Sequence, residues 1–176
     1  MALIEFVSEE NAQGEVANVY NTLKEKWGFV PDALKLFSSS EFLINHVFSS
    51  IGYFSTNMDL GGKLLALIRL MVSEEEKCVF CISMNRGILM QYGFLPEQLD
   101  AIQSDIENVS LPENEKSLLK FALKVVKNSS GVTSEDVQGL KSLGWTDKQI
   151  LEAAYHATNQ LSTDKLFNAF QINNDM

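Results

Sequence analysis

The chain has 176 residues, of which 45% are hydrophobic and 21% are charged, and its net charge is −9 with a pI near 4.7. This length suits one domain around a single core, and the composition is that of an ordinary soluble globular protein. Nucleic-acid backbone and anionic membranes bind proteins that carry clustered lysine and arginine. The negative net charge of this chain therefore argues against both as partners.

Neither export nor a membrane span is expected. The first ten residues lack the basic start and long apolar run of a signal peptide, and Glu5 interrupts them early. The most apolar stretch, Leu64 to Val72, is far shorter than a membrane span and contains Arg69. We therefore expect a cytoplasmic protein, with disorder only at 173–176.

Apolar residues recur at helical spacing almost everywhere, and no two-residue alternation reaches strand length, so the pattern predicts an all-α fold. The first predicted helix runs over 8–27 and is ended by Gly28, and a short one begins at Pro31. Apolar positions at helical spacing mark two further helices, over 42–54 and 64–71.

The second half of the chain continues in the same way. A helix that carries both cysteines is expected to end at Tyr92, before Gly93, and a brief helix begins at Pro96. Three more helices begin at Pro112, at Thr133 or Ser134, and at Thr146 or Asp147. No linker or repeat divides the chain, so we expect a single-domain helical bundle over residues 1–176.

The two cysteines, Cys78 and Cys81, are the only ones in the chain and form a Cys-Val-Phe-Cys motif. This spacing places both sulfurs on one face of a helix and suits a dithiol that closes reversibly. A helix start beside them would stabilise a thiolate by about a pKa unit or more. If the helix breaks at Lys77, Cys78 lies at its terminus; a capping box at Ser73 and Glu76 would instead place it in the second turn.

Two other interpretations of the motif stay open. A CxxC pair supplies half of a tetrahedral zinc site, but the only histidines, His46 and His156, lack ligand spacing and no second CxxC exists, so we expect no metal. The pair could also be two small buried apolar residues one turn apart. Redox chemistry is the preferred interpretation.

Two polar residues share the helical face of the cysteines. Asn85 follows Cys81 by four residues and could touch it directly or through water. Glu74 precedes Cys78 by four residues and could accept a thiol proton if the helix is unbroken. His156 has polar helical neighbours and is expected at the surface, whereas His46 is left without a role.

The run Leu64-Leu-Ala-Leu-Ile-Arg-Leu-Met-Val-Ser, followed by Cys78-Val-Phe-Cys81 and a helix ending at Gly93, resembles the core of the carboxymuconolactone decarboxylase superfamily. The resemblance is closer to its alkylhydroperoxidase D branch. The segments 28–37 and 144–154 also resemble its peroxidase-related members, so the likeness covers most of the chain.

The resemblance implies an all-helical antioxidant enzyme that forms trimers or hexamers and reduces organic hydroperoxides without a cofactor. Cys81 would attack the peroxide and form a sulfenic acid, which Cys78 would resolve into a disulfide. A lipoyl or thioredoxin-like dithiol protein would then restore both thiols.

The sequence departs from the proton relay of that family at two positions. Asn85 stands where the family has a histidine, and Ala66 where it has a glutamate. Asparagine cannot exchange a proton near neutral pH, so Glu74 is the expected replacement base. A thiol–disulfide exchanger or redox sensor, a non-catalytic oligomeric scaffold and, more remotely, a ring-decarboxylating enzyme remain as alternatives.

Overall fold

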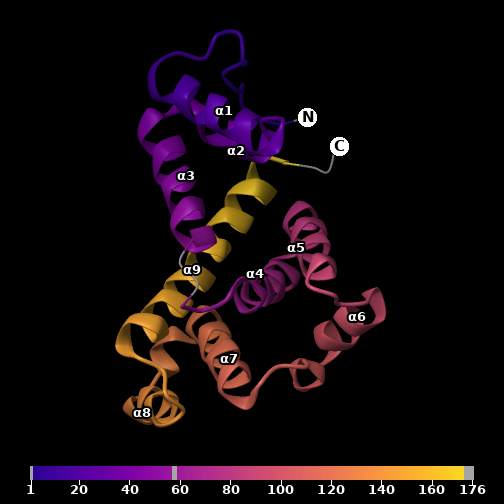
Figure 1. Cartoon of the computed structure of the whole chain (residues 1–176), viewed down its shortest axis with the longest axis vertical. Coiled ribbons are helices and arrows are strands. Elements are labelled where there is room, and N and C mark those ends of the chain that lie inside the picture. Colours follow the sequence, from indigo (N-terminus) through magenta and orange to yellow (C-terminus); the bar gives the residue numbers. More distant parts are fainter. Residues whose placement is uncertain (1, 57–58, 173–176) are drawn as a thin grey trace. The chain divides into compact units, whose positions relative to one another are not determined.

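The computed structural model describes residues 2–56 and 59–172, and every regular element among them is a helix (Figure 1). The predicted all-α fold is therefore confirmed, whereas the predicted disorder at 173–176 lies outside the described residues. Contacts divide the chain into two compact units, one made of residues 1–58 and 169–176 and one of residues 59–168. The expectation of a single domain stays a prediction.

The first unit contains three α-helices and a short 3-10 helix. The elements are α1 (Gly14–Trp27), α2 (Asp32–Lys35), η1 (Leu36–Ser39) and α3 (Glu41–Thr56). Helix α1 packs against α3, and its buried face is an amphipathic stripe made of Val16, Val19, Tyr20 and Leu23. The Tyr20 hydroxyl donates to the Val7 carbonyl at 2.9 Å, which ties the N-terminal segment to this helix.

The predicted start of the first helix at Ser8 is wrong, because α1 begins six residues later. Ser8 instead accepts from the Asn11 N–H within a turn. Gly14 has a φ of +53°, a left-handed conformation that a helix interior does not contain. The predicted stop is confirmed, since Gly28 follows α1 with a φ of +84°.

The second unit contains the cysteines. Its elements are α4 (Gly62–Glu76), α5 (Val79–Gln91), α6 (Pro96–Ser104), η2 (Ile106–Asn108), α7 (Glu113–Lys127), η3 (Ser129–Gly131), α8 (Ser134–Ser142) and most of α9 (Asp147–Ala169). Helix α4 packs against α5 and α7, and hydrogen bonds join it to α9 (Figure 1).

Helix α4 is the central helix of this unit because its sequence is apolar on almost every side. Its fully or nearly fully buried residues are Leu64, Leu65, Ala66, Leu67, Ile68, Leu70, Val72 and Ser73. A helix of this kind carries its few polar side chains into the interior, where each needs a partner. Arg69 and Ser73 are such residues, and their partners lie on α5 and α9.

No helix within residues 2–56 and 59–172 is both long enough and apolar enough to cross a membrane.

Candidate functional site

The chain break between α4 and α5 positions the two cysteines. Lys77 ends α4 with a left-handed φ of +56°, and Cys78 is the extended N-cap residue of α5. The Cys78 N–H donates to the Ser73 carbonyl at 3.1 Å, which closes the end of α4. The helix therefore breaks at Lys77, as one of the two sequence alternatives predicts, and Cys81 lies in the first turn of α5.

The dithiol lies against a carboxylate that comes from α9. The Cys78 sulfur, the Cys81 sulfur and a carboxylate oxygen of Asp164 all lie within 4.8 Å of one another. Asp164 and Cys81 are fully inaccessible to solvent, and Cys78 is 1% exposed. Both cysteines are free thiols.

Two polar neighbours orient the Asp164 carboxylate. Its Oδ1 atom accepts from the Gln160 amide at 2.7 Å and from the Ser73 hydroxyl at 3.2 Å. Its Oδ2 atom is buried and accepts no N–H or O–H group of the described residues. Residues of α4 and α9 thus fix Oδ1, and Oδ2 remains able to accept a proton from the adjacent thiols.

Burial and mutual proximity raise the proton affinity of this group. The pKa of the Cys81 thiol is raised because it hydrogen-bonds with Cys78, because it is buried, and because the Asp164 charge is close. Burial also raises the pKa of Asp164, and hydrogen bonds from Cys81, Gln160 and Ser73 oppose that rise. The expectation that the helix start lowers the thiol pKa is wrong for Cys81, since the hydrogen bond with Cys78, burial and the neighbouring carboxylate outweigh the helix dipole.

A second set of polar side chains lies beside Cys81. Asn85 donates its amide to the Cys81 carbonyl at 2.9 Å, and its Oδ1 accepts from Arg69 Nε at 2.7 Å. Arg69 Nη1 lies 3.0 Å from His156 Nε2. Asn85 therefore touches Cys81, as the helical spacing predicts, but through the backbone carbonyl.

The predicted surface position of His156 is wrong, because the residue is only 6% exposed. Burial and the Arg69 charge lower its pKa to about 3, and the Leu65 backbone opposes this through a hydrogen bond. A neutral imidazole accepts from Arg69 through Nε2. His46 lies in the other unit, where it is exposed and stacks on Phe42.

Glu74 is not part of this group. Its carboxylate accepts from the Gln103 amide at 2.7 Å. Burial raises the pKa of Glu74, the Arg86 charge opposes that rise, and the Asp100 charge adds to it. The proposed proximity to Cys78 required an unbroken helix, and the break at Lys77 removes it.

Sequence reasoning missed Asp164, although its signal was present. His156, Gln160 and Asp164 follow one another at intervals of four, so they form one polar stripe on α9. That stripe meets Arg69 and Ser73 on α4, also four residues apart. Matching polar pairs at this spacing predict a buried polar seam between helices.

Two solved structures resemble the chain over nearly its whole length. An uncharacterized peroxidase-related protein from Silicibacter sp. TM1040 has a TM-score of 0.79 and 20% sequence identity, over 96% of this chain and 86% of its own. An alkylhydroperoxidase AhpD core protein, described as an uncharacterized peroxidase-related protein from Ralstonia eutropha JMP134, has a TM-score of 0.78 and 20% identity, over 98% of this chain and 95% of its own. The chain has the AhpD-like fold. No protein-family model and no curated protein sequence matches it.

Within the AhpD-like fold, this chain supplies its acidic group from an unexpected place. Ala66, where the sequence resemblance implies a relay glutamate, is fully buried and carries no polar atom in its side chain. Asp164 reaches the dithiol from α9 instead. The acidic residue of this site therefore lies at a different sequence position from the one that the resemblance implies.

The dithiol and Asp164 offer three of the four ligands that a closed tetrahedral zinc site needs. No other cysteine, histidine or carboxylate among the described residues joins them. We therefore assign no metal to this site.

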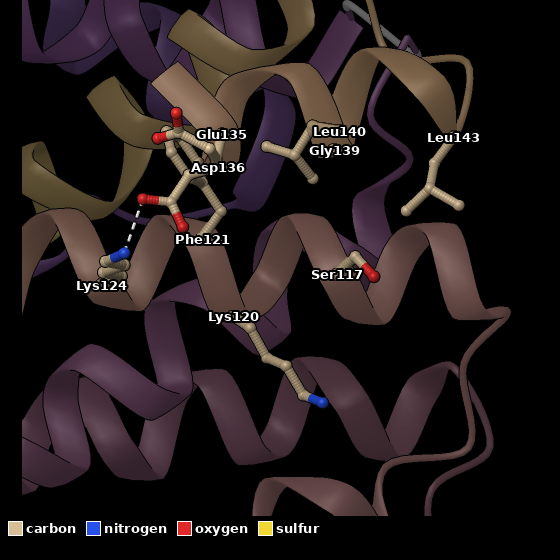
Figure 2. Close-up of a pocket in the computed structure, with 9 residues that line it drawn as sticks. All are labelled: Ser117, Lys120, Phe121, Lys124, Glu135, Asp136, Gly139, Leu140 and Leu143. Atoms are coloured by element: carbon tan, nitrogen blue, oxygen red, sulfur yellow. Dashed lines mark hydrogen bonds and ion pairs between the residues drawn. The ribbon is translucent and has the colours of Figure 1, made fainter. Parts of the chain in front are cut away.

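A separate pocket of about 330 Å³ lies between α7 and α8 (Figure 2). Figure 2 shows Lys124 reaching the Asp136 carboxylate across these helices, so the charges of these two lining residues satisfy each other. None of the residues that line the pocket belongs to the group around the dithiol.

The buried His156 makes a testable contribution to acid stability. Its pKa is about 3 in the folded protein and about 6.5 when exposed, so the unfolded chain binds the extra proton between these values. The free energy of unfolding should fall as pH drops from 6.5 to 3, by up to about 5 kcal/mol at about 1.4 kcal/mol for each pH unit. Urea unfolding at several pH values should show a flatter dependence for His156→Gln than for the wild type. The exposed His46→Gln variant is the control, and equal slopes for His156→Gln and the wild type would contradict the assignment.

Proposed function

We propose that the protein is a dithiol peroxidase that reduces organic hydroperoxides through Cys81 and Cys78. The observation that carries this proposal is the contact of two free thiols with an oriented, buried carboxylate. The fold agrees with it, since the similar solved structures are described as peroxidase-related.

Each step balances in atoms and electrons. The Cys81 thiolate attacks the hydroperoxide, an S–O bond forms as the O–O bond breaks, and the alcohol leaves with a proton. Cys78 then attacks the sulfenic sulfur of Cys81, forming the disulfide and releasing water. Two thiols are oxidised and one hydroperoxide is reduced to alcohol and water.

Asp164 is the proton acceptor in this mechanism. A thiol must lose its proton before it attacks, and the environment of Cys81 raises its pKa. A carboxylate within 4.8 Å can take that proton at the moment of attack and later return it to the leaving oxygen. Asn85 contributes by fixing the backbone at Cys81, and Glu74 has no part.

The cycle requires an external dithiol to reduce the disulfide. A lipoyl or thioredoxin-like protein is the proposed class of reductant, because dithiol exchange restores both cysteines without a further cofactor. We propose a homo-trimer or hexamer as the working assembly.

A thiol–disulfide exchanger is the second candidate, because two neighbouring free thiols are all that this reaction needs from the protein. Exchange needs a reactive pair but no base placed for an oxygen leaving group. Burial of both thiols slows either reaction until the site opens locally.

The test is consumption of cumene hydroperoxide in the presence of excess dithiothreitol as the reductant. The proposal expects multiple turnovers above the rate of dithiothreitol alone. Rapid exchange with an oxidised dithiol but no turnover of peroxide would overturn the peroxidase and support the exchanger. Inertness toward both would support the scaffold.

A further inference from the structure

Arg69 is a largely enclosed cation that has no anionic partner. Its Nε donates to the side-chain Oδ1 of Asn85 at 2.7 Å, and its Nη1 lies 3.0 Å from His156 Nε2. Both partners are neutral, and no carboxylate of the described residues pairs with it. The other arginine, Arg86, forms an ion pair with Asp100 at 2.7 Å.

An uncompensated charge of this kind is costly to the fold. Removing a guanidinium from water without a counter-charge costs several kcal/mol, on the order of the stability of a small domain. Burial lowers the pKa of Arg69 to about 10, so it still carries its charge at neutral pH. The chain has a net charge of −9, yet none of its described carboxylates is placed against this cation.

The Arg69 guanidinium also has N–H donors that no residue described in the structure accepts. It carries five N–H groups in a planar fork, and the two neutral partners engage only Nε and Nη1. The structure gives Nη2 no partner among the described residues. Arg69 keeps partial exposure to solvent, so the residue is not sealed off from a small ligand.

Two further residues border this cation. Tyr92 and Cys81 are the ionisable groups whose negative charge would favour the Arg69 cation. Tyr92 is 52% exposed, and its hydroxyl packs so closely on Gly62 that a Cβ there would collide with it. The Tyr92 phenol at the surface and the Cys81 thiol in the interior are thus both near enough to act on the Arg69 charge.

We propose that Arg69 is the binding site for the carboxylate of an organic ligand. A guanidinium fork matches a planar carboxylate in a charge-assisted hydrogen bond, and one cation neutralises one such charge. A phosphate dianion would need further positive groups, and no other arginine, lysine or charged histidine bonds to this group of residues. Asn85 links Arg69 directly to the Cys81 backbone, so the bound ligand lies beside the dithiol.

The substrate class follows if the proposed peroxidase function is correct. A hydroperoxide that carries a carboxylate would place its anionic end at Arg69 and its peroxide toward Cys81. This step rests on the proposed function, whereas binding of the carboxylate itself does not.

Benzoate and its neutral analogue benzamide are the probes for the binding site, used with the reduced full chain at constant ionic strength. We expect saturable binding of benzoate by isothermal titration, a matching rise in Tm, and neither effect with benzamide. Arg69→Met should weaken benzoate at least tenfold, and Arg69→Lys, which keeps the charge but loses the fork, should weaken it less. Arg86→Met, which removes the other arginine, should bind as the wild type does.

Three results would overturn the proposal: equal affinity of Arg69→Met and wild type for benzoate, no difference between benzoate and benzamide, or equal binding of inorganic sulfate. The comparison of benzoate with benzamide in the wild type stands even if Arg69→Met fails to fold. Because no peroxide is present, benzoate binding without peroxidase activity supports this site and defeats only the proposed function. A second assay compares a carboxylate-bearing hydroperoxide with its methyl ester; Arg69 should favour the free acid through KM, and an equal KM for both would refute the substrate class.

Discussion

Replacing Cys81 by serine is expected to abolish hydroperoxide turnover. A serine hydroxyl is a far weaker nucleophile than a thiol and forms no sulfenic acid, so the O–O bond is not cleaved. Cys78→Ser should behave differently, since Cys81 can still be oxidised once but cannot be resolved into an intramolecular disulfide. Hydroperoxide consumption measures turnover, and mass spectrometry of the Cys78→Ser protein should show the addition of one oxygen.

The two variants control for each other, because each removes one buried thiol of the same size, and the two positions are three residues apart. Unchanged hydroperoxide turnover in the Cys81→Ser variant would contradict the mechanism. Oxidation of Cys78 in the Cys81→Ser protein, at the wild-type rate, would reverse the roles of the two cysteines.

Replacing Asp164 by asparagine should slow the oxidation of Cys81 by about a hundredfold to ten-thousandfold, the usual cost of losing a general base. The amide keeps the shape of the carboxylate and can accept from Gln160 and Ser73, but it cannot take a proton. The same variant should lower the pKa of the Cys81 thiol, because the Asp164 charge and its hydrogen bond help to raise that pKa. A slower reaction with a more acidic thiol is thus the signature of a proton acceptor.

Thiolate absorbance against pH reports the thiol pKa, and stopped-flow oxidation reports the rate. Asp100→Asn, which removes a surface carboxylate paired with Arg86, is the matched control and should change neither quantity. If Asp164 served only to hold Cys81 protonated, Asp164→Asn would react faster than the wild type, and this result would contradict the proposed role.

The helices were predictable because the spacing of their apolar residues and the glycines that end them can be read from short stretches of sequence. Gly28, Gly93 and Gly144 each end a helix with a positive φ, as their positions in the sequence indicate. The start of α1 was not predictable in the same way, because Ser8 is a good N-cap and only the backbone at Gly14 rules it out.

The candidate site was predictable only in part. The CxxC motif identifies Cys78 and Cys81, and Asn85 follows from helical spacing. Asp164 lies 83 residues after Cys81, and its approach depends on how α9 crosses α4. That tertiary contact also buries His156, which local polarity alone places at the surface. The thiols could therefore be predicted from spacing within one helix, whereas Asp164 could not, because it reaches the site through packing between helices.

The most direct test of the account is a count of free thiols on the reduced protein before and after one equivalent of cumene hydroperoxide, with mass spectrometry to locate any new bond. The account predicts the loss of two thiols and a Cys78–Cys81 disulfide in the wild type, and a much slower loss in Asp164→Asn. Two thiols still free in the wild type after the hydroperoxide has been supplied would contradict it.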